Sequence, residues 1–350
     1  MNNSTPPKLS IIVPVYNVEQ YVAKSLNSLL RQGLKEQDYE IVIVNDGSTD
    51  GSKDICEQYA RLHSNIMLIN QKNDGVAEAR NHGLKVARGK WIVFVDSDDY
   101  LVDNGLKRIS RVIDQYPDAE LIRYYSSYST NPHDQVDDAV DFKGRAGELL
   151  LSGGYPAFIW TYAYKKSFLD AHEIRFKHLR FSEDGLFIAT VYLHNPFVVS
   201  TKADIYRYVL RADSAMGKRS RQQAQLTAED GLSAYELIKE EFTKSVFQGD
   251  RVVEASCIAS ENKKKASCYS RMLGSEYNYE EYKNLKERIS KDAFYPLIPW
   301  DKGRNTNLIC KIVNIMFLNF FTYKASSFFF TRIFTPYILP AYRKRVWANN

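Results

Sequence analysis

Four short apolar runs, separated by helix-like segments, constrain the fold of this chain more than any other feature. The runs are residues 9–15, 40–44, 66–69 and 91–95, and the helix-like segments lie at about 18–32, 51–62 and 75–87. None of the runs alternates apolar with polar residues, which is typical of strands buried on both faces of a parallel sheet. This succession predicts an α/β fold with a mostly parallel, Rossmann-like sheet flanked by helices.

Polar residues follow three of these runs at the point where the predicted strands end. They are Tyr16-Asn17, Asn45-Asp46 and Asp96-Ser97-Asp98-Asp99. The carboxyl ends of parallel strands form the ligand crevice of an open sheet. We therefore expect these side chains to surround a ligand.

Three carboxylates within residues 96–99 are the strongest chemical signal. Asp96 and Asp98, just past a buried strand, suit a hard divalent cation (Mn²⁺ or Mg²⁺) that takes oxygen ligands and keeps positions for phosphates. Such a cation would neutralise a diphosphate leaving group. A helix N-cap is the competing explanation, but three acids in four residues favour the cation.

The polar residues 45–51 end the second predicted strand. An ordinary turn explains Gly, Ser and Asp in this segment. Asp46 could instead accept a hydrogen bond from the imide N–H of uracil, because a base without that donor would leave a buried carboxylate unpaired. The residues alone leave both interpretations open.

Four segments resemble, in the same order, the motifs of family 2 glycosyltransferases. They are residues 10–17, 44–50, 75–84 and 94–99. The resemblance covers about residues 8–215 and implies a GT-A fold, inverting transfer from a nucleotide-sugar donor (UDP-sugar first) and a divalent metal. It implies Pro14, Tyr16 and Asp46 at the nucleobase, Asn73, Arg80 and Asp96 at the nucleotide and its sugar, and Asp98 at the metal.

A downstream segment resembles the family element that closes on the diphosphate. It contains Tyr206-Arg207-Tyr208 and Arg211, and a guanidinium suits a phosphate; a solvated strand face is the alternative. The residues expected around the nucleotide sugar are therefore Pro14, Tyr16, Asn17, Asp46, Asn73, Arg80, Asp96, Ser97 and Arg211.

Inverting transfer also needs a base that takes the proton of the acceptor hydroxyl. Residues 181–187 resemble the Glu-Asp element that supplies this base in the family. We predict Asp184 as the base and Glu183 as the second candidate, on the acceptor side. A capping box that begins a helix is the structural alternative.

Three aromatic residues alternate along a predicted strand: Trp160, Tyr162 and Tyr164. Alternation would place them on one face, where Trp160 could form a platform for the acceptor sugar. Core packing is the other interpretation.

The rest of the chain divides by composition. We expect a catalytic domain at 1–215 (nucleotide half about 8–130, acceptor half about 131–215, with a polar loop at 130–147), a helical region at 216–300 and a basic, aromatic tail at 301–350. The longest uncharged run of the tail, 312–323, is too short to span a bilayer. The tail suits peripheral contact with an anionic membrane or packing against the chain or a second subunit.

The formal net charge of +5 is concentrated in the tail, where residues 301–350 carry eight Lys and Arg against one acid. A nearly neutral body argues against a nucleic-acid partner. The four cysteines match no zinc or disulfide spacing, which indicates a reducing compartment. The N-terminus lacks a basic start followed by an apolar stretch, so we expect no secretory signal and a place at the cytoplasmic face of the membrane.

These features predict an inverting glycosyltransferase that moves a sugar, by metal-assisted in-line displacement, to an acceptor hydroxyl of a polysaccharide or lipid-linked glycan. Two alternatives stay open: a catalytically inactive, membrane-associated scaffold that binds nucleotide or glycan, and a sugar nucleotidyltransferase. The nucleotidyltransferase would need a Gly-rich loop after the first strand. A dehydrogenase is disfavoured because the chain has no GxGxxG motif.

Overall fold

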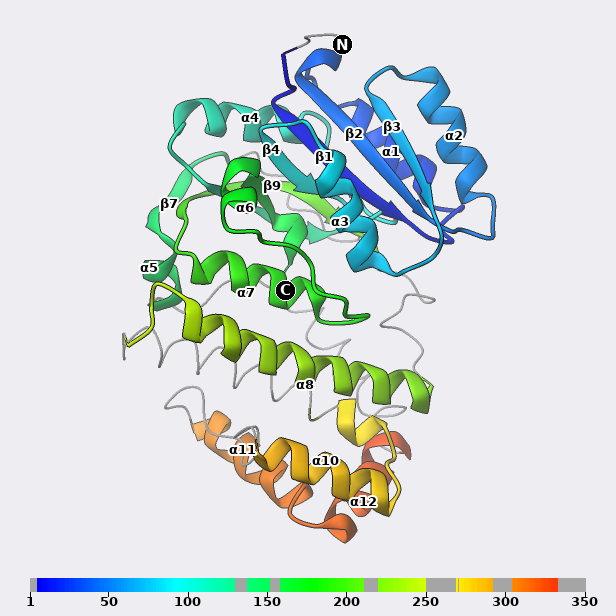
Figure 1. Cartoon of the computed structure of the whole chain (residues 1–350), viewed down its shortest axis with the longest axis vertical. Coiled ribbons are helices and arrows are strands. Elements are labelled where there is room, and N and C mark those ends of the chain that lie inside the picture. Colours follow the sequence, from blue (N-terminus) through cyan, green and yellow to red (C-terminus); the bar gives the residue numbers. More distant parts are fainter. Residues whose placement is uncertain are drawn as a thin grey trace. The chain divides into compact units, whose positions relative to one another are not determined.

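The computed structural model describes residues 5–129, 137–151, 158–210, 220–249, 269, 271–291 and 304–332. The chain divides into two compact units, residues 1–212 and 213–350 (Figure 1). Each unit is described by itself below.

The four predicted apolar runs form four neighbouring strands of one sheet in the first unit. They are β1 (Leu9–Val15), β2 (Tyr39–Asp46), β3 (Ile66–Gln71) and β4 (Trp91–Phe94). They pair in parallel in the order β3-β2-β1-β4. The parallel half of the predicted fold is thus confirmed.

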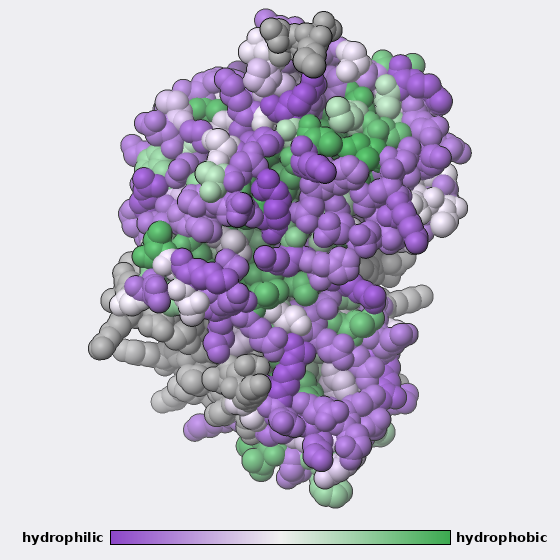
Figure 2. All heavy atoms as spheres, in the orientation of Figure 1, coloured by the Kyte–Doolittle hydropathy of each residue, from purple (hydrophilic) through white to green (hydrophobic). Residues whose placement is uncertain are grey.

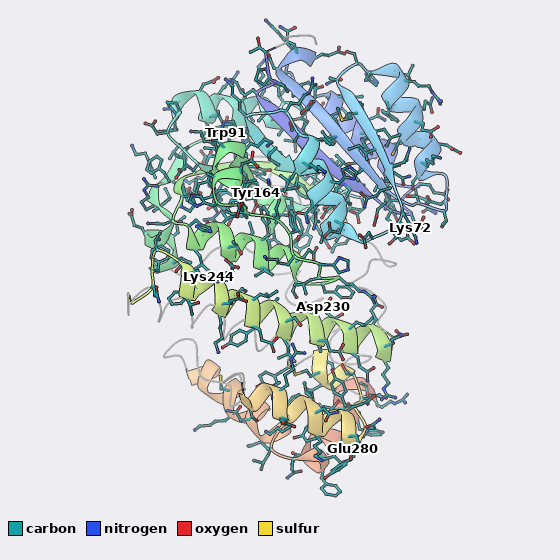
Figure 3. All side chains as sticks on the ribbon, viewed as in Figure 1. Lys72, Trp91, Tyr164, Asp230, Lys244 and Glu280 are labelled. Carbon is teal, nitrogen blue, oxygen red and sulfur yellow. The ribbon has the colours of Figure 1, made fainter. Side chains whose placement is uncertain are left out.

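The sheet continues beyond β4 with antiparallel pairs and one parallel pair, β6 with β9, so that the whole sheet is mixed. Its further strands are β5 (Tyr100–Leu101), β6 (Leu121–Tyr128), β7 (Val140–Arg145), β8 (Tyr162–Lys165) and β9 (Phe197–Tyr208). Strand β8 lies antiparallel between β4 and β6, with Tyr164 opposite Ile92 and Lys165 opposite Trp91; Trp91 and Tyr164 are labelled in Figure 3.

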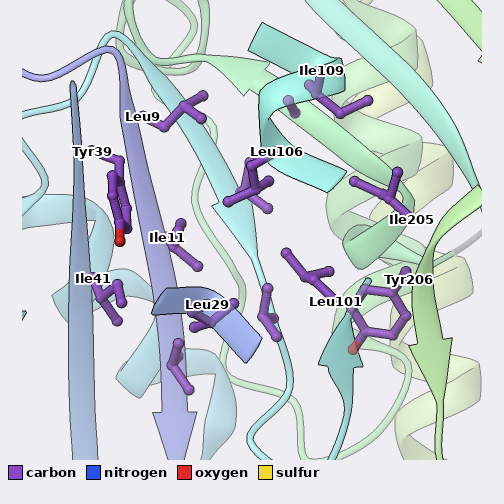
Figure 4. Packing of buried hydrophobic residues seen from close by; sticks show 14 of the residues in the cluster. Leu9, Ile11, Leu29, Tyr39, Ile41, Leu101, Leu106, Ile109, Ile205 and Tyr206 are labelled. Carbon is purple, nitrogen blue, oxygen red and sulfur yellow. The ribbon is translucent and has the colours of Figure 1, made fainter. Parts of the chain in front are cut away.

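Helices cover both faces of this sheet. In chain order they are α1 (Val22–Leu30), α2 (Ser52–Leu62), α3 (Val76–Val86), α4 (Gly105–Gln115), α5 (Ala146–Leu151), α6 (Lys166–Ala171) and α7 (Glu183–Leu193), with 3-10 turns at Glu36–Asp38 and Ile159–Thr161. The absence of alternation in β1 follows from this cover. Ile11 lies in the core with Leu29 of α1 and Leu106 of α4 (Figure 4), whereas Ile12 lies against Gly83 of α3.

Helix α4 shows how sequence spacing becomes packing. Leu106, Ile109 and Ile113 recur at helical spacing and are all buried against the sheet. Full burial of one such side chain stabilises the fold by about 1.5–3 kcal/mol. This packing holds the sheet as a rigid base for the loops at its carboxyl edge.

Two local predictions are wrong. Residues 140–145, expected within a polar loop, form β7, which pairs antiparallel with β9. Its residues alternate between half-buried and exposed. The strand therefore has a mostly polar composition, like that of a loop. Trp160 lies in a 3-10 turn, not on a strand with Tyr162 and Tyr164, because residues 159–161 turn before the chain enters β8.

The second unit is helical where it is described. Its helices are α8 (Arg221–Lys244), α10 (Tyr279–Lys291), α11 (Arg304–Met316) and α12 (Phe320–Phe329). Figure 3 labels Asp230 and Lys244 on α8 and Glu280 on α10. A separate apolar core includes Leu232, Met272, Ile289 and Phe317. Among the described residues no helix has the length and apolar character that crossing a bilayer requires.

Candidate active site

The loops that follow β1 and β2 are tied together at the carboxyl edge of the sheet. The side-chain oxygen of Asn17 accepts a hydrogen bond from the backbone N–H of Thr49 at 2.8 Å, and the Asn17 N–H donates to the Ser48 hydroxyl at 3.2 Å. Glu19 accepts from the Gly51 N–H at 2.7 Å. Asn17 has a φ of 50°, a left-handed conformation in which asparagine is enriched. The two loops therefore form one continuous rim.

Asp46, the last residue of β2, is buried and holds the loop that follows β3. One carboxylate oxygen accepts from the Gln71 side chain at 2.8 Å and from the Asp74 N–H at 2.9 Å. The other accepts from the Gly75 N–H at 2.9 Å. Sequence reasoning missed this structural role. Its signal was the spacing between Asp46 and the Gly-containing segment before α3.

Pro14 and Tyr16, expected at the nucleobase, and Asn73, expected near the nucleotide and its sugar, differ in exposure. Pro14 is buried within β1, whereas Tyr16 is 48% exposed and Asn73 is exposed. A Cβ on Gly47, whose φ is +70°, would stand 2.8 Å from the backbone nitrogen of Asn73. Glycine thus lets the loop after β3, in which Figure 3 labels Lys72, approach the end of β2.

Arg80, on α3, is buried and joins carboxylates from distant parts of the chain. Its Nη2 donates to Asp96 at 2.9 Å, and its Nη1 donates to Glu183 at 2.9 Å and to Asp184 at 2.8 Å. Its guanidinium lies 5.4 Å from the ring centre of Phe176. The structure therefore brings together four of the predicted site residues around one cation.

Three carboxylates, those of Asp96, Glu183 and Asp184, share the single positive charge of Arg80. Burial raises the pKa of Asp184 well above its ordinary value; Arg80 opposes this shift, and the nearby Glu183 and Asp96 add to it. Burial alone would lower the pKa of Arg80, but the same carboxylates raise it. Asp184 therefore holds a proton more strongly than an exposed aspartate does.

The acids after β4 have different environments. Ser97 and Asp99 are buried, whereas Asp96 and Asp98 are half-buried. Asp99 accepts from the Tyr206 hydroxyl at 2.6 Å and from the Val209 N–H at 2.8 Å. Burial, with the neighbouring Asp96 and Asp98, raises the pKa of Asp99 to about 8. The third acid of this segment thus anchors the end of β9.

A second tie was also missed by sequence reasoning. The Asn81 side chain donates to the Phe176 carbonyl and accepts from the Phe176 N–H, each at 2.9 Å. Together with Arg80, it attaches α3 to the segment that leads into Glu183-Asp184. Both residues belong to the 75–84 motif. The spacing of that motif predicts a helix but does not indicate these contacts.

The fit of a divalent cation can be tested on the donor set. Within the described part of the chain, no three His, Cys, Asp or Glu side chains converge as a complete metal site. A Mg²⁺-like ion that binds a nucleotide needs only one or two carboxylates, because water and phosphate supply the other ligands. The carboxylates of Asp96 and Asp98, both half-buried, fit such an ion.

Trp160 is part of an aromatic stack. Its ring is nearly parallel to those of Phe158, Tyr206 and Tyr208, at centroid distances of 5.0, 5.8 and 5.9 Å. Trp160 is half-buried, whereas Phe158 is 51% exposed. Tyr206 connects this stack to the acidic segment after β4, because its hydroxyl donates a hydrogen bond to Asp99. Arg211 lies outside the described residues.

Comparison with known proteins agrees with this geometry. The family model described as "Glycosyl transferase family 2" matches residues 10–173. The glycosyltransferase EpsH of Bacillus subtilis is 32% identical over 238 residues, which are 66% of this chain and 67% of EpsH. TarS of Staphylococcus aureus, a poly(ribitol-phosphate) β-N-acetylglucosaminyltransferase, is 33% identical over 206 residues, which are 57% of this chain and 35% of TarS.

Solved structures share the fold. The structure of TarS 1–349 in complex with UDP aligns with a TM-score of 0.62 and 22% identity, over 93% of this chain and 89% of that one. The mannosyltransferase PcManGT of Pyrobaculum calidifontis, in complex with GDP-Man and Mn²⁺, aligns with a TM-score of 0.52 and 15% identity, over 89% and 87%. The chain is a GT-A-like glycosyltransferase and belongs to glycosyl transferase family 2.

Proposed function

We propose that this enzyme transfers a sugar from a UDP-sugar, with inversion at the anomeric carbon, to a hydroxyl of a cell-envelope polysaccharide or lipid-linked glycan. The observation that carries the proposal is the Arg80 cluster. It places Asp96, at the end of a nucleotide-side strand, and Asp184, at the start of α7, on the same guanidinium. In this proposal the donor site and the proton acceptor are therefore adjacent.

The donor side is assigned to residues at the carboxyl edge of the sheet. In this proposal Tyr16 and the loop that Asp46 holds contact the base, with Pro14, Asn17 and Asn73 shaping the pocket. Asp96 and Ser97 bind the ribose or sugar, and Arg211 pairs with the diphosphate. The UDP complex of TarS supports a uridine nucleotide, and the GDP-Man complex of PcManGT makes guanosine the second candidate.

Asp98 is the residue proposed to hold a divalent cation. When bound, the cation supplies positive charge that stabilises the departing diphosphate. Asp184 accepts the proton of the acceptor hydroxyl as the oxygen bonds to the anomeric carbon, and the nucleoside diphosphate leaves from the opposite face. Arg80 stabilises the ionised form of Asp184, and Glu183 disfavours it.

The acceptor is proposed to meet the aromatic stack. Phe158 presents the exposed ring, and Trp160 supports it from within the stack. Aromatic faces pack well against the C–H faces of sugar rings. Glu183, beside the base, is the polar residue assigned to the acceptor side.

The test is thermal unfolding with UDP, GDP, CDP and dTDP, each with Mn²⁺, Mg²⁺ or no metal. A ligand at a hundred times its dissociation constant adds about 2.7 kcal/mol to the free energy of unfolding. We expect UDP to stabilise the protein only with metal, and Asp98→Ala to remove the response. A melt that no nucleotide shifts would contradict the proposal.

Turnover separates an enzyme from an inactive scaffold. Release of UDP from a panel of UDP-sugars, with acceptor glycans present, is expected for wild type and lost in Asp184→Asn. A protein that binds UDP but releases none with any donor would favour the scaffold.

A further inference from the structure

The helical hairpin α11–α12 exposes an unusual concentration of large apolar side chains. Among the described residues sixteen large hydrophobic side chains are exposed, and seven of them lie in this hairpin. We call these seven the hairpin surface: Leu308, Ile312, Ile315, Leu318, Phe321, Phe328 and Phe329. Figure 2 shows hydrophobic side chains reaching the surface at the lower end of this unit.

The opposite side of the hairpin is buried, so the exposed side is defined by packing. Cys310, Phe317 and Tyr323 are in the core of the second unit. Leu308, Ile312 and Ile315 recur at i, i+4 and i+7, which places them along one stripe of α11. The hairpin is thus apolar on two sides, of which only one has a partner within the described residues.

Hydrogen bonds hold the hairpin in this orientation. Tyr282 and Lys286, from α10, donate to the Phe317 carbonyl at 2.8 and 2.7 Å. On α12, the Tyr323 hydroxyl donates to the Met272 carbonyl at 3.0 Å. These contacts fix the turn between α11 and α12, so exposure of Phe321, at 82%, is a property of the folded unit.

The charged side chains described on α11 and α12 are all basic. Asp301 is the last acid in the sequence, and residues 302–350 contain eight Lys and Arg. Lys311, Lys324 and Arg332 are exposed on or next to the two helices. Apolar side chains that insert below a headgroup layer, flanked by bases that stay at it, are typical of segments lying on an anionic membrane.

We propose that the hairpin surface docks on an anionic lipid bilayer, with α11 and α12 lying in the interface. The helices have 13 and 10 residues, too few to span the hydrocarbon core. A bilayer is favoured over a second copy of this chain, because two such surfaces face to face would oppose the bases of α11 and α12, whereas an anionic headgroup layer would attract them.

The experiment is sedimentation of the full chain with vesicles of phosphatidylcholine alone or mixed with phosphatidylglycerol, at low and high salt. We expect binding to the anionic vesicles that weakens at high salt. The double variant Phe321→Ser, Phe328→Ser should weaken binding to anionic vesicles by about tenfold or more, because it removes apolar contacts and leaves only the charged ones. The matched control is Leu62→Ser, on α2 and 69% exposed, which should bind as wild type does.

Three outcomes would overturn the proposal. They are no binding to anionic vesicles, equal loss in the Leu62→Ser control, and light scattering that shows a dimer dissolved by the Phe321→Ser, Phe328→Ser variant. The UDP-dependent melting shift is measured on every variant. A normal shift without membrane binding would reject this surface alone, whereas membrane binding without a shift would reject the proposed nucleotide site alone.

Discussion

The two sides of the proposed active site, the nucleotide side and the base side, are built in different ways. On the nucleotide side, short loops after β1, β2 and β3 hold one another through backbone hydrogen bonds, with Asp46 and Asn17 as acceptors. On the base side, Asp184 stands at the start of α7 and is held by Arg80, 104 positions earlier in the chain. The first side rests on several hydrogen bonds between loops 28 to 32 positions apart, the second on one buried cation. A single substitution should therefore damage the base side more.

The largest expected effect is on turnover. Asp184→Asn keeps the shape of the side chain but removes the proton acceptor, so kcat should fall by about 10²–10⁴-fold. Binding of UDP, measured by calorimetry, should stay within about twofold of wild type, since the donor loops do not depend on this carboxylate. Full activity in the variant would assign the base elsewhere, with Glu183→Gln as the next test.

Arg80→Met should have the largest effect on stability. It leaves Asp96, Glu183 and Asp184 without their common cation, and breaking a buried ion pair costs about 3–5 kcal/mol. Chemical unfolding measures the loss. The control is Arg31→Ala, which breaks a mostly exposed pair with Asp103 and should cost about 0–1 kcal/mol. Equal losses would mean that Arg80 is no more important than a surface residue.

Gly47→Ala and Gly75→Ala measure how tightly the nucleotide loops pack. Both glycines have positive φ, at 70° and 91°, and each substitution should cost about 1–3 kcal/mol for backbone strain; at Gly75, whose ψ is 162°, the conformation is one that essentially only glycine adopts. Only at Gly47 would the new Cβ also meet a backbone atom, 2.8 Å away in Asn73, whereas Gly75 has open space. Both variants should lose stability, but Gly47→Ala should lower UDP affinity more than Gly75→Ala, because only it disturbs the junction with Asn73. The opposite order would contradict the packed junction.

The smallest expected effect is in the pH dependence. Because the pKa of Asp184 is raised, its basic form is lost as pH falls through that raised value, and kcat should fall by at most about tenfold per pH unit there. The native state binds this proton more tightly than the unfolded chain, so the free energy of unfolding falls as pH rises through the same window. The kcat limb should vanish in Asp184→Asn, and a kcat limb that persists would belong to another group. The stability limb should shrink but persist, because Asp99, whose pKa is raised to about 8, also binds its proton more tightly in the native state.

Much of the nucleotide side was predictable because its determinants are local. The unalternating run of β1 predicted a strand covered on both faces, and Ile11 and Ile12 indeed lie against different helices. The polar ends of β1, β2 and β4 predicted the edge at which Asp46 and Asp96 lie. Strand β7 was missed because an edge strand with one half-buried face has the composition of a loop.

The sequence by itself therefore determined the parallel half of the sheet, the edge that carries the site and the family to which the chain belongs, because these depend on periodicity and on short motifs. Only the tertiary structure decided that Arg80 joins Asp96 to Asp184, that Asp99 faces inward to Tyr206, and that Phe321 is exposed while Phe317 and Tyr323 are buried. Those outcomes depend on contacts between residues far apart in the chain, whose partners no local pattern specifies.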